Sequence, residues 1–318
     1  MKCKLCGEKA FLLAQKISGY IQGTSYTVFL CLKCETQFIA DAYDKKIYEV
    51  IYSAQGAFGY ERYGKYVAEI KKQENPLDWL SKKEPAYLYV EQFVRRKKKL
   101  RILEIGCGDG YLTYALNQAG HIVTGIDISE EAIRVAKRNF GDFYQAIDLK
   151  DFTKLYDFDL IVCTETIEHL ADPVKFVALC KGLLGEDGQI LLTTPNKDYR
   201  SLNTVWQVEA PPVHRFWMGH KTFEAIAKQT GMKCEFLPCV MPMDMERNNL
   251  IAYFSSRGSN KFGSVLDKEG KVFPSNPSRL RNILRDFFMW TPIRYFCNGL
   301  TLYVFKIKEA PTLGAILK

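Results

Sequence analysis

Short apolar runs alternate with helix-like segments through the middle of this chain of 318 residues. Residues 111–119, for example, place apolar side chains at the three- and four-residue spacing of a helix with one buried face. The runs expected to form buried strands are residues 100–105, 121–127, 142–147, 158–163, 189–194, 233–240 and 300–307. Strands that alternate with helices predict an α/β fold with a mainly parallel sheet.

A glycine-rich turn follows the first of these strands. Its glycines, Gly106, Gly108 and Gly110, are spaced G-x-G-x-G, and Glu104 stands two positions before the first of them. A strand, a glycine turn and a helix N-terminus offer backbone N–H groups to a polar ligand. A dinucleotide site would carry a small residue where this chain has Tyr111. Because Glu104 can meet a cationic amino-acid tail, the pattern favours S-adenosylmethionine over NAD.

Acidic residues also end the next two predicted strands. Asp127 comes 23 residues after Glu104, where an acid accepts hydrogen bonds from ribose hydroxyls. Asp148 ends the third strand and is placed to accept a hydrogen bond from an adenine amino group. A solvated loop carboxylate explains either acid equally well when it is considered alone. Their joint occurrence at the same edge of the sheet favours a nucleoside site.

These motifs together carry a family resemblance. Residues from about 99 to 232 resemble class I S-adenosylmethionine-dependent methyltransferases, among them ubiquinone-biosynthesis O-methyltransferases and antibiotic-sugar methyltransferases. The matching stretches are residues 103–110, 125–129, 165–170, 192–196 and 211–214. The resemblance implies a Rossmann-like sheet of seven strands whose last strand is antiparallel. It also implies that residues 233–240 and 300–307 pair as a hairpin, so that residues 241–298 are an insertion.

The resemblance also implies which residues hold the cofactor. Glu104 and Gly106 would line its methionine end, Asp127 its ribose, and Ile128 and Asp148 its adenine. The full set of implied cofactor-binding residues is Glu104, Gly106, Cys107, Gly108, Asp127, Ile128, Asp148, Leu149, Thr164 and Glu165.

Four of the ten cysteines form two C-x-x-C pairs at the N-terminus, namely Cys3, Cys6, Cys31 and Cys34. Each pair can direct two thiolates at one tetrahedral ion, and a hairpin between the pairs would bring them together. Residues 1–40 are therefore predicted to form a zinc ribbon. A pair of redox dithiols is the alternative, but neither motif has the strand–helix context of a thioredoxin-like site.

Methyl transfer to a hydroxyl requires little more than positioning and a base, for which histidine suits neutral pH. The chain has four histidines. We rank His214 first as the base, because a histidine at this position faces the acceptor in the sugar-modifying relatives, and then His169 and His220. His121 opens a strand on the far side and is expected to be structural. Pro212 and Val213 replace a Tyr and a Glu found in some relatives, which favours oxygen over carbon methylation.

Residues 41–98 are expected to form a helical, tyrosine-rich segment between the ribbon and the predicted methyltransferase domain at 99–318. In the relatives such a segment folds over the cofactor as a lid. We therefore expect Tyr60, Tyr63 or Tyr66 to reach the substrate pocket, with Tyr63 as the representative candidate. Packing at helical spacing explains these tyrosines equally well.

Composition restricts the partners and the location. No apolar run approaches the roughly 20 residues of a membrane span, and the N-terminus has no signal-peptide core, so a cytoplasmic location is expected. A helix pattern within residues 279–297 suggests either packing on the sheet edge or a peripheral membrane contact. The net charge of +8 suits an anionic or lipid-linked small molecule.

The sequence thus predicts a methyltransferase that uses S-adenosylmethionine and acts on a hydroxyl of a sugar, glycolipid or quinone-like acceptor. The alternative is a ribbon protein that binds nucleic acid or a protein, either as an RNA-directed methyltransferase or as a non-catalytic regulator. The basic run at residues 95–99 is explained better as a solvated helix end. Thr164 and Glu165 stand where many nucleic-acid amino-methyltransferases have an N/D-P-P-Y turn, so nucleic acid is the second choice.

Overall fold

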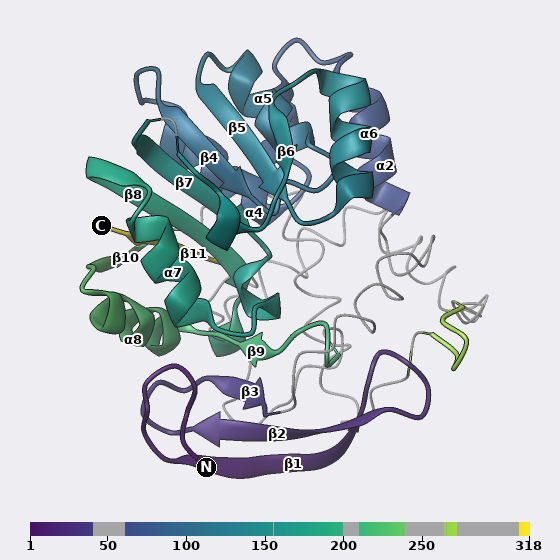
Figure 1. Cartoon of the computed structure of the whole chain (residues 1–318), viewed down its shortest axis with the longest axis vertical. Coiled ribbons are helices and arrows are strands. Elements are labelled where there is room, and N and C mark those ends of the chain that lie inside the picture. Colours follow the sequence, from purple (N-terminus) through teal and green to yellow (C-terminus); the bar gives the residue numbers. More distant parts are fainter. Residues whose placement is uncertain (41–60, 155, 200–209, 239–263, 265, 272–311) are drawn as a thin grey trace, which may run out of the picture.

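The computed structural model describes most of the chain (Figure 1). The described residues are 1–40, 61–154, 156–199, 210–238, 264, 266–271 and 312–318. They form a seven-stranded sheet flanked by helices and a four-stranded sheet at the N-terminus.

The larger sheet has the strand order β10-β11-β8-β7-β4-β5-β6. Neighbouring strands from β6 to β8 run parallel, whereas β11 runs antiparallel to both of its neighbours. This arrangement confirms the predicted seven-stranded α/β sheet with an antiparallel last strand. The bounds are β4 Arg101–Ile105, β5 Ile122–Asp127, β6 Tyr144–Ala146, β7 Phe158–Thr164, β8 Leu184–Pro195, β10 Cys234–Phe236 and β11 Thr312–Leu317.

The seventh strand is not the one predicted. Residues 300–307 lie outside the described residues, and the place between β8 and β10 is taken by Thr312–Leu317. Close packing explains why this strand contains a glycine at position 314. A Cβ at Gly314 would lie 2.7 Å from the ring of Tyr89 on helix α4 (Pro85–Val94). Because a close helix crossing demands a small residue there, the segment looks less like a strand in sequence than residues 300–307 do.

Helices cover both faces of this sheet. Helices α2 to α6 bury their apolar sides on one face together with alternate strand residues such as Ile102 and Val162. Helices α7 and α8 pack on the opposite face with the intervening residues, such as Leu103 and Ile161. The bounds are α2 Glu61–Ile70, α3 Pro76–Ser81, α4 Pro85–Val94, α5 Tyr111–Gln118, α6 Glu130–Phe140, α7 Pro173–Lys181 and α8 His220–Thr230, with short 3-10 turns η1 Leu149–Asp151, η2 Ile167–His169 and η3 Lys197–Tyr199.

Local sequence explains where these helices begin. Ser129 caps α6, since its side chain accepts a hydrogen bond from the Ala132 N–H at 3.2 Å, and Glu130 and Glu131 occupy the first turn. Asp172 caps α7 in the same way, ahead of Pro173. Gly231 ends α8 in the left-handed region at φ 63°.

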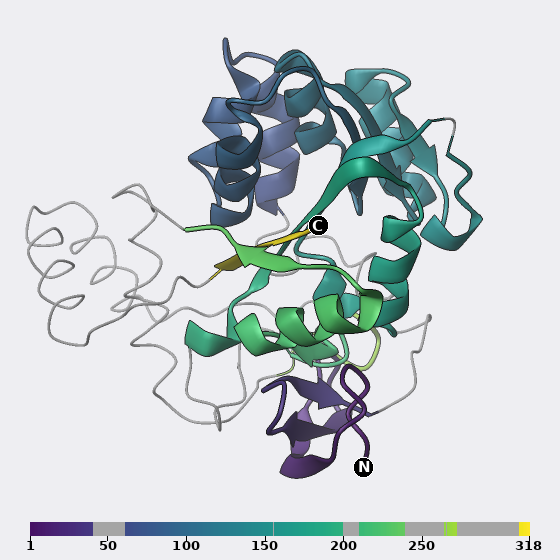
Figure 2. The ribbon, with the colours of Figure 1, turned by 90° about the vertical axis from the view of Figure 1, so that its left-hand side faces the viewer.

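The N-terminal strands β1 (Ala10–Ser18), β2 (Ser25–Cys31) and β3 (Gln37–Ile39) form the second sheet. Its fourth strand, β9 (Phe216–Trp217), comes from a segment far from the N-terminus in the sequence and pairs with β3. Figure 2 shows α8 between β10 and these N-terminal strands. The ribbon is therefore built into the rest of the molecule through a shared sheet.

Several other predicted segments differ in length from the observed elements or lie outside the described residues. Strands β6 and β10 are shorter than expected, and β8 begins earlier, at Leu184. Residues 279–297 and most of the insertion at 241–298 lie outside the described residues. In the part of the chain that the structure describes, no helix is long and apolar enough to cross a membrane.

Candidate active site

The glycine turn lies at the carboxyl edge of the sheet, between β4 and α5. Gly106, Gly108 and Gly110 all have positive φ angles, of 76°, 49° and 84°. A Cβ at Gly106 or Gly110 would collide with side chains at 2.6 Å, whereas one at Gly108 would meet nothing within 4 Å. Two glycines thus permit close packing, and Gly108 presents bare backbone to open space where a ligand can approach.

Asp127 ends β5 directly beside this turn. Its carboxylate accepts hydrogen bonds from the backbone N–H groups of Gly108 at 3.0 Å and Ser129 at 2.8 Å. The next residue, Ile128, is 70% exposed, although it follows a largely buried strand. An exposed apolar side chain beside a fixed carboxylate suits a nucleoside, whose ribose is polar and whose base is flat.

Asp148 and Leu149 begin the 3-10 turn after β6. The Asp148 carboxylate accepts a hydrogen bond from the Lys150 N–H at 3.1 Å and lies 3.3 Å from the Lys150 ammonium. Because the Ile147 N–H donates to the Asp127 carbonyl at 2.9 Å, this turn is tied to the end of β5. The two predicted nucleoside acids therefore sit on adjoining strand ends.

Glu104 is only 3% exposed, on the central strand. The hydroxyl of Thr113, on α5, donates a hydrogen bond to its carboxylate. Burial raises the pKa of Glu104 to about 8, and the Coulombic effect of Asp127 acts in the same direction. A cationic group bound here would stabilise the ionised carboxylate. The sequence reading missed Thr113, although its helical position after the turn faces the strand.

Glu165 follows the end of β7 and has a left-handed backbone with φ 48°. Thr193 on β8 holds it, because the Thr193 hydroxyl donates to the Glu165 carboxylate at 3.0 Å and the Thr193 carbonyl accepts from the Glu165 N–H at 3.1 Å. Thr164 accepts a hydrogen bond at its carbonyl from the Thr166 hydroxyl at 2.9 Å. Thr193 is fully buried and was not predicted as a site residue.

The structure brings together the two histidines ranked first and second. The rings of His169, on η2, and His214, in the loop before β9, are 4.6 Å apart and nearly perpendicular. His169 Nδ1 lies 2.6 Å from the Val213 carbonyl and donates to it. Burial lowers the pKa of both rings, that of His214 to about 3.

Glu168 joins this pair, and the sequence reading did not single it out. It is 1% exposed, and its carboxylate lies 3.8 Å from His169 Nε2. Ligand atoms of Glu168, His169 and His214 all lie within 4.8 Å of one another. Neutral imidazoles and a carboxylate are ordinary ligands for divalent cations, so these three residues could hold one.

The other candidate residues lie in different surroundings. Tyr63 stacks on Tyr111 with ring centroids 6.1 Å apart and lies beneath the Arg62 guanidinium at 4.6 Å, within an aromatic cluster on α2 and α5. His220 Nδ1 bonds the Asp198 carboxylate at 2.7 Å. His121 accepts a hydrogen bond from the Leu100 N–H at 3.2 Å. Tyr60 falls outside the described residues.

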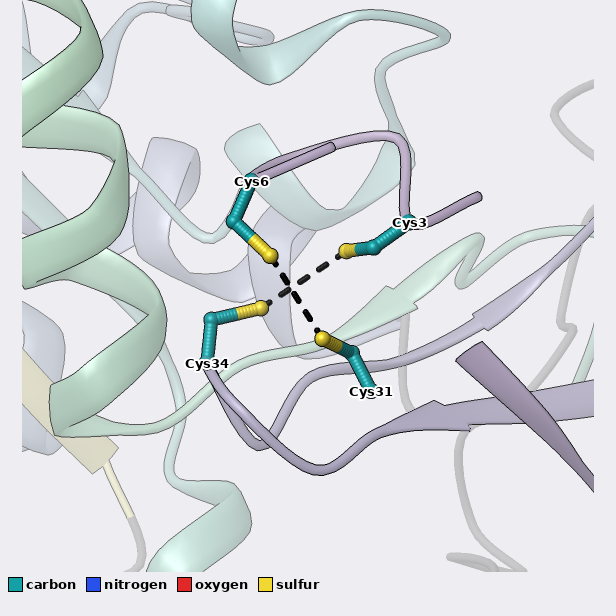
Figure 3. A group of neighbouring side chains, drawn as sticks. All are labelled: Cys3, Cys6, Cys31 and Cys34. Carbon is teal, nitrogen blue, oxygen red and sulfur yellow. Dashed lines mark hydrogen bonds between the residues drawn. The ribbon is translucent and has the colours of Figure 1, made fainter. Parts of the chain in front are cut away.

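The four N-terminal cysteines converge on one point (Figure 3). The Sγ atoms of Cys3 and Cys34 are 3.6 Å apart, and those of Cys6 and Cys31 are 3.4 Å apart. Tetrahedral zinc with Zn–S bonds of about 2.3 Å requires S–S separations of about 3.8 Å. The cluster therefore has the size and the donor set that fit zinc.

Comparison with known proteins agrees with this geometry. A methyltransferase-domain family matches residues 80–235. A ubiquinone biosynthesis O-methyltransferase of Coxiella burnetii is 37% identical over 119 residues, which are 36% of this chain and 50% of that protein. One from Aromatoleum aromaticum is 36% identical over 108 residues, which are 32% and 46% of the two chains. The chain thus spans about half the length of the curated relatives it matches.

Among solved structures, the plantazolicin methyltransferase BpumL in complex with S-adenosylhomocysteine is 18% identical, with a TM-score of 0.44. The similarity covers 86% of this chain and 97% of that one. The family match and the strand order agree on the central part of the molecule. Residues 80–235 therefore form a domain of the class I S-adenosylmethionine-dependent methyltransferase family.

Proposed function

We propose that this protein transfers the methyl group of S-adenosylmethionine to a hydroxyl group of a small molecule. One arrangement carries this proposal. The buried Glu104 and the strand-end Asp127 flank the open backbone of Gly108. His169, in η2 after β7, meets His214, which lies in the loop before β9. We infer that the cofactor binds at the glycine turn and that the acceptor binds beside these two histidines.

Different residues would bind the cofactor and accept the proton of the acceptor. Glu104 would pair with the ammonium group of the cofactor's amino-acid tail, and Asp127 would accept hydrogen bonds from its ribose hydroxyls. The bound cofactor supplies an activated methyl group. What remains for the protein is to hold the acceptor oxygen in line and to accept its proton. His214 is our first candidate for this base, and His169 orients the loop through Val213.

An oxygen acceptor is supported by the curated relatives, which are named O-methyltransferases. A sugar, a glycolipid or a quinone-like compound would each offer such a hydroxyl. The net charge of +8 favours an anionic or lipid-linked form. For the N-terminal cysteines we propose a structural zinc ion, because the four sulfurs leave no open coordination position for catalysis.

Calorimetric titration with S-adenosylhomocysteine tests the cofactor site. Asp127→Ala should weaken binding about 10- to 100-fold, because hydrogen bonds to a charged group are lost. The matched control is Asp142→Ala, at a carboxylate whose side chain is 92% exposed, and it should bind as the parent protein does. If the zinc-loaded parent protein did not bind the ligand, the proposed activity would be wrong.

An acceptor screen tests the histidines. Release of S-adenosylhomocysteine should be followed with catechols, sugar nucleotides and a structured RNA, the last as the alternative acceptor. With an active acceptor, His214→Ala should lower kcat about 100-fold or more while leaving cofactor affinity unchanged. Normal turnover by this variant would remove His214 from the mechanism.

The cluster of Glu168, His169 and His214 favours a second way to activate the hydroxyl. A divalent cation held by these residues would act as a Lewis acid on the acceptor oxygen. Dialysis against EDTA followed by Mg²⁺ distinguishes the two routes. Recovery with Mg²⁺ alone would support the cation, whereas unchanged activity of the metal-free protein would rule it out.

A further inference from the structure

The ribbon and the loop that carries His214 are joined through their backbones. Strand β3 pairs with β9 so that Gln37 faces Trp217 and Phe38 faces Phe216. One residue further, the Ile39 N–H donates to the Arg215 carbonyl at 3.0 Å. The backbone pairing between the ribbon and this segment therefore extends to Arg215, the residue next to His214.

The same loop is bonded to the other histidine segment on its far side. The Arg215 N–H donates to the Glu168 carbonyl at 2.9 Å, and the Val213 carbonyl accepts from His169 Nδ1 at 2.6 Å. Arg215 thus bridges the ribbon and η2 with its carbonyl and its N–H. A shift of β3 would be transmitted to both histidines.

Hydrogen bonds from helix α8 also reach the backbone of both C-x-x-C motifs. The Thr222 hydroxyl on α8 donates to the Cys34 carbonyl at 3.0 Å. The Gln229 amide on the same helix donates to the carbonyl of Leu5, which lies between Cys3 and Cys6. The Thr36 hydroxyl donates to the Trp217 carbonyl at 3.3 Å.

Buried aromatic side chains pack between β3 and β9 and restrict their relative movement. Phe38 and Phe216 are 0% and 1% exposed, with their rings stacked 6.2 Å apart. They belong to one buried cluster that also contains Cys31, Cys34 and Phe223 of α8. Because close-packed interiors transmit displacement, the geometry of the cysteine cluster constrains β9 and the loop before it.

We propose that the metal-bound ribbon is a positioning element for the acceptor-side histidines, which sets the placement of His214 and His169 through β3 and β9. This inference rests on the proposed function for the roles of the zinc and of the histidines. The cofactor residues are held differently, since Glu104 bonds Thr113 and Asp127 bonds Gly108 and Ser129. Loss of the ribbon metal should therefore disturb the histidines and spare cofactor binding.

Nuclear magnetic resonance of the full chain labelled at its histidine rings tests this inference directly. Four ring signals are expected, assigned by single His→Gln variants. In the variant Cys31→Ser, which should lose the ribbon zinc but keeps Glu168, His169 and His214, the His214 and His169 signals should shift or broaden. His121, at the opposite edge of the sheet, serves as the internal reference. Affinity for S-adenosylhomocysteine should change less than about twofold. Unchanged His214 and His169 signals after verified loss of the metal would overturn the proposal.

A variant that keeps the metal separates positioning from unfolding of the ribbon. Thr36→Val removes the hydroxyl that bonds Trp217 but not a cysteine, so zinc content should stay at that of the parent protein while the His214 signal shifts. Thr230→Val is the matched control, because the Thr230 hydroxyl bonds only carbonyls within α8, at 3.0 and 3.1 Å. Equal spectra for the two variants would contradict the proposal. A failure to bind S-adenosylhomocysteine or zinc would instead count against the proposed function, and the comparison of the two variants would still decide the positioning role.

Discussion

At the scale of single residues, the most unusual feature is the almost fully buried carboxyl group of Glu104. Glu104 lies in the central strand with one hydroxyl donor, Thr113, and no cation beside it among the contacts that the structure shows. Burial of a charge without a cationic partner is costly, which is why the pKa of this carboxyl rises to about 8. A ligand that brings a positive charge would remove much of this cost.

Cofactor affinity should therefore depend on pH. Between pH 6 and 8 the unliganded protein holds a proton on Glu104 that an ammonium-bearing ligand must displace, so affinity for S-adenosylhomocysteine should rise with pH, by up to about tenfold per unit, and level off above pH 8. Calorimetry at several pH values measures this dependence. Glu104→Gln should bind weakly at all of them. Thr113→Val should move the rise to higher pH, because its hydroxyl lowers the pKa of Glu104. A flat profile for the parent protein would contradict this account.

At the scale of elements, the turn between β4 and α5 is shaped by what packs behind it. Gly110 has φ 84°, and its missing side chain leaves room for Ala136 and Tyr144, each 2.6 Å from where a Cβ would be. The Tyr144 hydroxyl donates to the Gly110 carbonyl at 2.7 Å. The turn is thus held from β6 and α6 as well as from its own strand.

Two glycine substitutions separate backbone strain from crowding. Gly120 has a similar φ of 94°, but a Cβ there would meet nothing within 4 Å. Gly120→Ala should cost about 1 kcal/mol of unfolding free energy, whereas Gly110→Ala should cost about 1–3 kcal/mol more, because its methyl group must displace side chains. Urea unfolding of both variants measures the difference. Equal losses would show that the turn can relax around an added methyl group.

At the scale of the whole molecule, the ribbon shares two buried clusters with the rest of the chain. Cys31 and Phe38 of the ribbon are buried in one cluster with Phe216 and Phe223. A second cluster combines Ile17, Tyr26 and Val28 with Trp217 and Leu266. The N-terminal sheet also takes its fourth strand from residues 216–217. Cooperative unfolding of both parts together follows from this sharing.

Metal removal should then lower the thermal stability of the whole chain. The parent protein should contain one zinc ion, and Cys31→Ser should lose it and lower Tm by about 5 °C or more. Cys234→Ser is the control, since Cys234 is a free, half-buried cysteine on β10 outside the cluster. Metal analysis and calorimetry measure both effects. A separate low-temperature transition for the ribbon, with the remainder unchanged, would show that the shared core does not couple the two parts.

The sequence by itself determined the features that depend on neighbouring residues. The glycine turn after β4, the acids at the ends of β4 and β5, the cap of α6 at Ser129 and the two C-x-x-C motifs are all local patterns. A strand, turn or cap is specified mainly by residues close together in the chain, so its spacing survives in the sequence. The alternation of strands and helices likewise predicted a mainly parallel sheet, whereas the order of its strands comes from the structure.

Only the tertiary structure decided the features that join distant segments. It placed Thr312–Leu317 as the seventh strand, because Gly314 fits beneath Tyr89. It brought Glu168 to His214 and paired β3 with β9. A strand of two residues, such as Phe216–Trp217, has too little periodicity to be recognised in sequence. Its pairing is stabilised by a side chain 181 residues away, and only the folded chain shows that the ribbon bonds the strand that follows His214.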